Sequence, residues 1–323
     1  MEKEAVTLYK RYEKRIVGHL ALGLILYLLI TTAVVLADYG VRIGLLLLAR
    51  TLGWETQSFS SLATSFSDSY WSMILGALLG VFFLKFWMQQ SIPMPALFFE
   101  RKKMEPAVLV SFLCVFAAGQ LLFTGFSYLL EFCLNLIGLS SASAIEQATG
   151  VMTEPSMILY AAVLAPVTEE IIFRGYCLRC AQQFGRNFAI IFSAALFAIM
   201  HANVPQAFFA FYVGIILGVI TTEYSIKYAI LFHLINNFAF GELLELMLSG
   251  LPDRLHEISF YLLFGMFAFC AVVVIILYRR QIVRYIRSGH SIRHTYLYAF
   301  SALPVVIFIL LCLVPALMML DKI

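Results

Sequence analysis

The chain has 323 residues, of which 62% are hydrophobic and only 13% are charged, and its formal net charge is +3. Soluble globular domains carry roughly 25% charged residues, so a water-facing surface for a chain of this size is excluded. The sequence also lacks basic tracts with interleaved aromatic residues, which excludes nucleic acid as a partner and leaves the lipid bilayer as the surroundings to be expected.

Long apolar stretches follow one another along the chain. Crossing about 30 Å of hydrocarbon takes about 20 helical residues, and most of the stretches reach that length. We therefore predict an all-α, polytopic bundle of about nine transmembrane helices. The stretches run near residues 16–37, 71–88, 107–130, 156–175, 187–203, 206–223, 226–248, 257–278 and 297–320. The fifth and sixth are short and meet at Asn203–Gln206, so they could instead form a tight hairpin that does not fully cross.

Two connecting segments carry structural expectations of their own. Segment 41–50 is short and apolar between Arg42 and Arg50, and it predicts an interfacial helix. Segment 91–103 contains prolines and ends in three basic residues, and it predicts a cytoplasmic connection.

The basic residues predict the orientation. With a cytoplasmic N-terminus and nine crossings, 18 of the 22 Lys and Arg residues fall on the inner side. Only Arg42, Arg50, Arg254 and Lys322 fall outside. Because cytoplasmic loops are enriched in Lys and Arg, we expect a multi-pass protein of the cell membrane whose C-terminus is extracytoplasmic.

Charged side chains within the fourth stretch need an explanation, since one at mid-bilayer costs about 2.5–3.5 kcal/mol on insertion scales. Glu170 and Arg174 are four residues apart, so they share a helix face and are expected to pair. Glu169 is rotated about 100° away and is left free for proton chemistry. The alternative interpretation is an ion network at the end of a span.

The fifth and seventh stretches carry further polar residues. His201 follows Phe197 by four residues, and Asn237 follows His233 by four, with Asn236 beside it. Residues four apart lie on one helix face, so His233 and Asn237 should face the same cavity. Alternatively, His201 is a hydrogen-bonded structural residue, and the His/Asn face holds helices together.

The same helix carries Glu242 and Glu245 nearer its outer end. We expect both to be polar residues of the outer rim, away from the cavity.

Three motifs therefore stand in order on separate stretches, namely Glu169-Glu170-x-x-x-Arg174, Phe197-x-x-x-His201 and His233-x-x-x-Asn237. Their order and spacing resemble the CAAX protease and bacteriocin-processing family of intramembrane peptidases, also called CPBP or Abi, which is related to the type II CAAX prenyl endopeptidases. The resemblance covers roughly residues 154–240 and favours a prokaryotic origin. It divides the chain into N-terminal helices and their cytoplasmic connection (1–153), a catalytic core on spans four to seven (154–248) and C-terminal helices (249–323).

The resemblance implies that Glu169, Glu170, His201, His233 and Asn237 are catalytic. Glu169 with His201 would activate a water molecule as general base and partner. His233 and Asn237 would donate hydrogen bonds to the developing oxyanion. Around them, Arg174 would orient Glu170, and Phe197 and Asn236 would support the site.

The participation of a metal is left open by the motifs. Glu169, His201 and His233 could bind zinc and leave a position for water. However, these residues come from three spans, unlike the compact H-E-x-x-H motif of soluble zinc enzymes, and a glutamate can activate water unaided. We favour a metal-free site without a cofactor.

The sequence thus predicts an intramembrane endopeptidase that hydrolyses a membrane-associated peptide or protein. The alternative is a non-catalytic scaffold or bacteriocin-immunity protein that uses the same pocket for binding, with membrane proteins as partners. A transporter is disfavoured, because transporters often contain repeated halves and no internal repeat is found.

Overall fold

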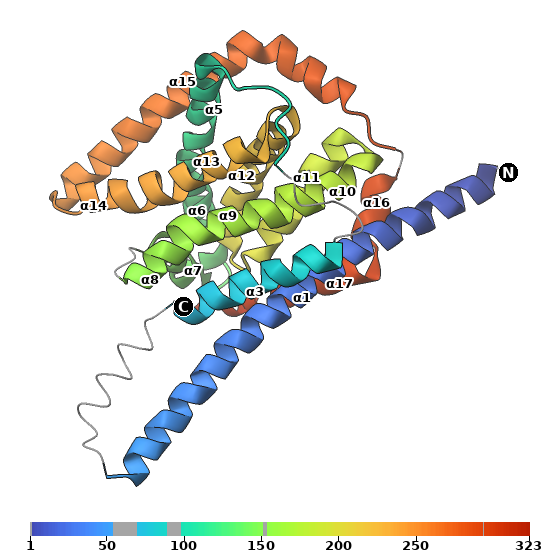
Figure 1. The fold of residues 1–323 in the computed structure, drawn as a ribbon. Coiled ribbons are helices and arrows are strands. Elements are labelled where there is room, and N and C mark those ends of the chain that lie inside the picture. Colours follow the sequence, from blue (N-terminus) through green and yellow to red (C-terminus); the bar gives the residue numbers. More distant parts are fainter. Residues whose placement is uncertain (1, 54–69, 89–97, 151–153, 293) are drawn as a thin grey trace.

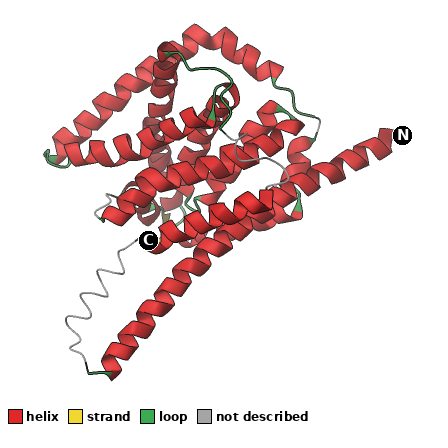
Figure 2. Ribbon diagram, in the orientation of Figure 1, coloured by secondary structure: helices red, strands yellow, loops and turns green. Residues whose placement is uncertain are grey.

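A computed structural model describes residues 2–53, 70–88, 98–150, 154–292 and 294–323. Helices account for nearly all of this part of the chain (Figure 2), which confirms the all-α prediction. Within the described residues, seven helices are long and apolar enough to cross a membrane. Two shorter apolar helices, Arg186–Met200 and Leu303–Met318, correspond to the fifth and ninth predicted stretches. The protein is therefore a polytopic membrane protein.

The first helix is much longer than the predicted span. Helix α1 (Glu2–Thr51) continues through segment 41–50, so the predicted separate interfacial helix was wrong. Arg42 forms an ion pair with Asp38 one turn earlier on α1, which lets the helix carry a charge without ending. Of the predicted connection 91–103, residues 91–97 lie outside the described part, and the remainder is not helical.

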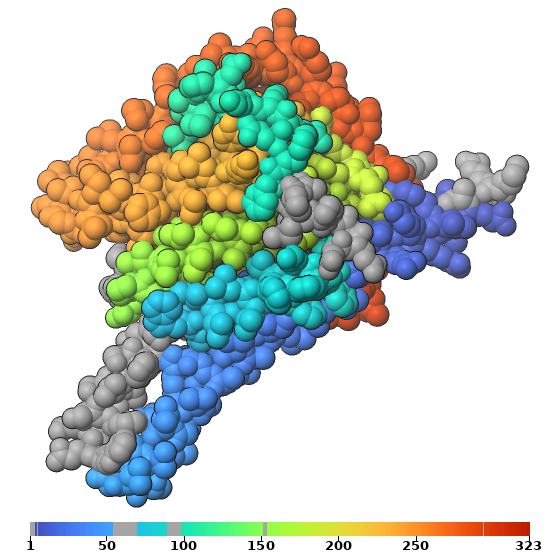
Figure 3. Space-filling view, viewed as in Figure 1, coloured from blue at the N-terminus to red at the C-terminus, as the bar shows by residue number. Residues whose placement is uncertain are grey.

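Helix α3 (Trp71–Met88) packs on α1 through two glycines spaced as G-x-x-x-G. A Cβ atom added at Gly80 would lie 2.5 Å from Cδ2 of Tyr27, and one at Gly76 would lie 3.1 Å from Cα of Thr31. Small residues at this spacing let two helices approach closely in a membrane, where dispersion forces drive association. Figure 3 shows α3 lying along α1 at one side of the molecule.

Residues 155–184 form one continuous helical rod at the centre of the bundle (Figure 1). Its geometry alternates between α-helix and the wider π-helix before it ends in a 3₁₀ turn. The segments are α8 (Pro155–Ile158), π-helix η1 (Leu159–Leu164), α9 (Ala165–Glu170), π-helix η2 (Ile171–Leu178), α10 (Arg179–Ala181) and 3₁₀-helix η3 (Gln182–Phe184).

Three further rods surround this one and complete the predicted core. Helices α11 (Arg186–Met200) and α12 (Val204–Glu223) form an antiparallel hairpin with a tight turn at residues 201–203. The seventh stretch forms a third rod from α13 (Ile226–Leu234), π-helix η4 (Ile235–Leu243) and α14 (Leu244–Leu248). The largest buried apolar cluster joins the central rod and α11 to α1, α3, α16 and α17.

The remaining elements pack around this core. Helices α5 and α6 contact both α12 and α15, whereas α16 and α17 lie along α1. Their bounds are α5 (Pro106–Ala117), α6 (Gly119–Asn135), β1 (Leu139–Ser140), α7 (Ala142–Thr149), α15 (Asp253–Ser288), α16 (Thr295–Phe300), α17 (Leu303–Met318) and β2 (Asp321–Lys322). The two short strands pair antiparallel. The N- and C-termini lie on opposite sides of the bundle in Figure 1, and their sides of the membrane stay a prediction.

Candidate active site

Two of the three polar motifs lie at or next to π-helical segments, whereas Phe197 and His201 belong to α11 and its C-terminal end. Glu169 and Glu170 stand between η1 and η2, and Asn236 and Asn237 open η4. A π-helical turn contains one residue more than an α-helical turn and often marks functional sites. The extra residue rotates the following side chains, so the backbone itself adjusts the directions in which these polar groups point.

Glu170 is held by two partners in a fully buried position. Its Oε1 atom lies 3.1 Å from Nη1 of Arg174, so the expected ion pair on one helix face is present. His233 of α13 reaches the same oxygen with Nδ1 at 3.0 Å, and because a carboxylate only accepts, Nδ1 is the donor. Glu170 and Arg174 are 0% exposed and His233 is 4% exposed. The fourth and seventh stretches are thus joined by an Arg–Glu–His chain.

Some atoms of this chain have no hydrogen-bond partner within the described residues. They are Oε2 of Glu170 and the three guanidinium nitrogens of Arg174, of which Nη1 has only the ion-pair contact with Glu170. Buried polar groups in native proteins are nearly always satisfied by protein or water, so orphaned atoms indicate a site that binds water or a further polar group.

Glu169 is the most accessible carboxylate of the cluster, with a side chain that is 18% exposed. Its Oε2 atom lies 3.7 Å from Nε2 of His233, beyond a direct hydrogen bond. The sequence predicted that Glu169 would lack the Arg174 partner, and no ion pair joins these two among the described residues. The structure adds His233 as a neighbour that faces both glutamates.

The ring of Phe197 lies at the centre of the cluster. The Cζ atom of Arg174 lies over the ring face, 4.3 Å from the ring centroid, which is a cation–π contact. The imidazole rings of His201 and His233 meet the Phe197 ring edge-on, with distances between ring centroids of 4.8 and 5.7 Å. His201 donates from Nδ1 to the carbonyl of Phe197 at 2.8 Å. This bond fixes the tautomer, so Nε2 carries the lone pair. Glu169 lies within electrostatic range of His201.

A proline in the central rod leaves free the backbone carbonyl to which Asn237 donates a hydrogen bond. In the π register of η1, the Ala165 N–H bonds to the carbonyl of Tyr160, and the next residue would bond to Ala161. That residue is Pro166, which has no N–H. Asn237 donates its Nδ2 to the Ala161 carbonyl at 2.9 Å instead. Because Nδ2 carries two hydrogens, one remains for another acceptor.

A hydrogen-bond chain extends from Asn237 to a helix outside the predicted core. Asn236 donates to Oδ1 of Asn237 at 3.0 Å, and Gln120 of α6 donates to Oδ1 of Asn236 at 3.1 Å. Sequence reasoning missed Gln120, although a glutamine within an apolar stretch was a visible signal. Tyr27 and Tyr160 also lie within electrostatic range of Glu169, and tyrosine is too common near membrane interfaces to have identified them.

Glu242 and Glu245 remain apart from the cluster. Glu245 lies 3.3 Å from Nε2 of His256 on α15, and Glu242 has no interaction with the site residues in the described structure.

The proposed zinc ligands Glu169, His201 and His233 do not form a metal-binding arrangement. Among the described residues, no group of three His, Cys, Asp or Glu side chains could hold a metal ion. One nitrogen of His233 is engaged by Glu170, and one nitrogen of His201 by the Phe197 carbonyl. We therefore derive no catalytic step through a metal, and metal independence stays a prediction.

Comparison with known families agrees with the motifs. The family model described as type II CAAX prenyl endopeptidase Rce1-like matches residues 152–239, which include all three motifs. The expected resemblance is thus confirmed over this segment, and the match supports a CAAX-type protease function within the membrane. No curated protein and no solved structure gives a significant match.

Proposed function

Because residues 152–239 match the Rce1-like family, we propose that this chain is an intramembrane endopeptidase in which Glu169 activates a water molecule. The observation that carries the proposal is the division of labour between two adjacent glutamates. Glu170 is fixed by Arg174 and His233, whereas Glu169 is partly exposed, lies 3.7 Å from Nε2 of His233 and is within electrostatic range of His201. Two neighbouring carboxylates that lie in different environments can take different catalytic roles.

Glu169 and His201 together orient the nucleophile. A water that donates one hydrogen to the Glu169 carboxylate and the other to Nε2 of His201 directs an oxygen lone pair at the scissile carbonyl. Glu169 takes the proton as hydroxide adds to the carbonyl carbon, and then gives it to the departing amine nitrogen as the C–N bond breaks. The net reaction is hydrolysis of one peptide bond, with Glu169 regenerated.

His233 and Asn237 stabilise the oxyanion that forms at the scissile carbonyl by donating hydrogen bonds to it. Asn237 has one N–H left after its bond to Ala161. His233 offers Nε2–H when its ring is protonated, and the group of Glu169, Glu170, Arg174 and His233 then carries no net charge. A neutral cluster is the least costly arrangement of these four groups in a low-dielectric interior. Donors fixed before reaction are the largest source of rate enhancement in acyl transfer.

The experiment compares wild-type protein with Glu169→Gln in membranes from matched cells, by peptidomics of the released fragments. The substitution keeps the side-chain volume and removes the base. Fragments that depend on the protein should disappear in Glu169→Gln and persist in Glu242→Gln, an otherwise similar change outside the cluster. The identified substrate, cut by purified wild-type protein but not by Glu169→Gln, completes the test.

The same comparison separates a peptidase from a scaffold or immunity protein. If Glu169→Gln folds normally and still yields the fragments, Glu169 is not the base. If Glu169→Gln folds normally, yields no fragments and still fully supports a cellular phenotype that requires the protein, the pocket serves binding in that role. The peptidase proposal is then wrong for it.

A further inference from the structure

Gln120 of α6 joins the site from outside the segment that matches the family model. Its Nε2 donates to Oδ1 of Asn236 at 3.1 Å, and Asn236 donates to Oδ1 of Asn237 at 3.0 Å. Asn237 in turn donates to the Ala161 carbonyl at 2.9 Å. This series of three hydrogen bonds, the amide relay, runs from α6 through η4 to the central rod.

The direction of every bond in the amide relay follows from its last acceptor. A backbone carbonyl only accepts, so Asn237 must turn Nδ2 toward Ala161 and Oδ1 toward Asn236. Asn236 must then donate to that oxygen, which turns its own Oδ1 toward Gln120. Only a donor is compatible with this position, and the glutamine supplies Nε2. An acceptor in its place would set two oxygens against each other or reverse both asparagine amides.

Packing between α6 and α12 holds Gln120 in place. The preceding residue is Gly119, where an added Cβ atom would lie 2.7 Å from Cε1 of Tyr212 and 3.1 Å from Cε2 of Phe209. The Tyr212 hydroxyl donates to the Val115 carbonyl, which ties α5 to α12 just before α6 begins. The start of α6 is therefore seated closely against α12, and Gln120 reaches η4 from a fixed position.

The amide relay fixes the N–H that remains on Asn237. One corner of this planar amide is held by Ala161 and another by Asn236, so the direction of the second N–H is set. The proposed function assigns this N–H to the oxyanion, and such donors act most strongly when they are oriented before reaction. Hydrogen bonds in series also polarise one another, which strengthens the last donor.

We propose that Gln120 is a positioning residue, which orients and polarises the Asn237 amide toward the oxyanion through Asn236. The inference rests on the proposed function, because the reaction that Gln120 assists is the peptide hydrolysis. It also makes α6, one of the N-terminal helices, a part of the active site. The alternative is a bond that only holds helices together, as interhelical hydrogen bonds in membranes do. Kinetics separate the two roles.

The test measures kcat and KM of purified full-length protein on a quenched-fluorescent peptide with the cleavage site found by the peptidomics above. Rates are divided by the folded fraction from size exclusion. Gln120→Met keeps the length of the side chain and removes the donor. Losing one neutral hydrogen bond should lower kcat about fivefold. KM should stay unchanged, because the interaction assists the transition state and not substrate binding.

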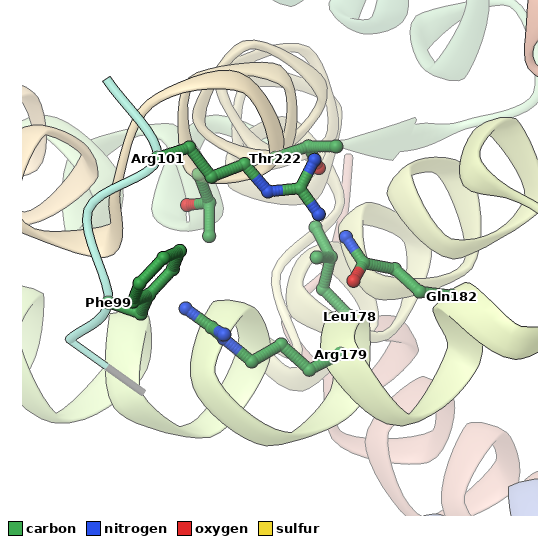
Figure 4. A pocket seen from close by; sticks show the side chains of 7 residues that line it. Phe99, Arg101, Leu178, Arg179, Gln182 and Thr222 are labelled. Carbon is green, nitrogen blue, oxygen red and sulfur yellow. The ribbon is translucent and has the colours of Figure 1, made fainter. Parts of the chain in front are cut away.

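Gln182→Met is the matched control, since it makes the same substitution at another half-buried glutamine. Gln182 belongs to η3 and lines a polar cavity near the end of the central rod (Figure 4). The described lining of that cavity contains no residue of the amide relay. Both kcat and KM of Gln182→Met should equal the wild-type values.

A double-mutant cycle identifies the residue through which Gln120 acts. Gln120→Met should lower kcat about fivefold in the wild-type background and cause no further loss in Asn237→Ala, where the amide that it orients is absent. A bond that only holds helices together would give the same fractional change in both backgrounds.

Three outcomes overturn the inference while hydrolysis by the wild type stands. They are a wild-type kcat in Gln120→Met, a raised KM without a fall in kcat, and equal fractional losses in the two backgrounds of the cycle. A different result refutes the proposed function itself, and the inference falls with it. In that case, wild-type protein releases no fragments that Glu169→Gln lacks.

Discussion

Replacing Arg174 by methionine should destabilise the protein severely, and the structure gives the magnitude. Arg174 is fully buried, its Nη1 lies 3.1 Å from Glu170, and its guanidinium covers the Phe197 ring. Methionine preserves much of the packing but leaves the Glu170 charge with only His233 as a partner. Removing one partner of a buried ion pair costs about 3–5 kcal/mol, a large share of the stability of an ordinary domain. We expect little Arg174→Met protein to elute as a folded monodisperse species from detergent.

A double variant tests the reasoning. Arg174→Met with Glu170→Gln removes both charges, and exchanging a buried ion pair for neutral groups is often neutral or stabilising. Its unfolding temperature should therefore recover most of the loss, while peptidase activity stays low. Thermal unfolding followed by fluorescence-detected size exclusion measures this recovery. If the double variant is as unstable as Arg174→Met, the cost comes from packing against Phe197, and the electrostatic argument is refuted.

Four further predictions concern catalysis, metal, topology and packing. Asn237→Ala should lower turnover about 10²–10³-fold, as expected for one lost oxyanion donor. It should also reduce the yield of folded protein, because the Ala161 carbonyl loses its donor. Wild-type turnover in the folded fraction would contradict the role of Asn237 as an oxyanion donor. Extensive chelation should leave activity unchanged, and purified protein should lack stoichiometric zinc; activity that is lost and restored with one equivalent of zinc would contradict a metal-free site. A reporter fused after Ile323 should read extracytoplasmic, whereas a cytoplasmic reading would show that one apolar stretch does not cross. Gly80→Leu should separate α3 from α1 and lower the unfolding temperature, with Gly40→Leu as the control because nothing lies within 4 Å of that position.

The apolar stretches and one ion pair were predictable from the sequence because they depend on local rules. In lipid, a spanning segment must satisfy its backbone groups internally, so long apolar runs become helices. The pairing of Glu170 with Arg174 follows from helical spacing alone. The sequence also identifies His233 as a polar residue within an apolar stretch, but it does not show which partner His233 contacts.

The partners across the bundle required the structure. Nothing in the spacing says that His233 reaches Glu170, or that Gln120 joins the site from a helix more than a hundred residues away from Asn236. The π-helical turns were missed because they arise from tertiary packing and have no simple hydrophobic period. The continuation of α1 through 41–50 does not follow from the sequence, because a charged residue such as Arg42 predicts the end of an apolar helix unless its ion pair with Asp38 is known.

The bond between Asn237 and the Ala161 carbonyl also bears on biosynthesis. The donor lies more than seventy residues downstream of the acceptor, so the ribosome makes the central rod well before the residue that completes it. Until η4 docks, that rod holds a carbonyl which hydrocarbon cannot satisfy, at a cost of several kcal/mol. The step that removes this cost is the same one that brings His233 and Asn237 to Glu169 and Glu170. On the proposed function, a half-made chain would therefore be unable to cut its neighbours in the membrane, because catalytic competence and completion of the fold arrive together.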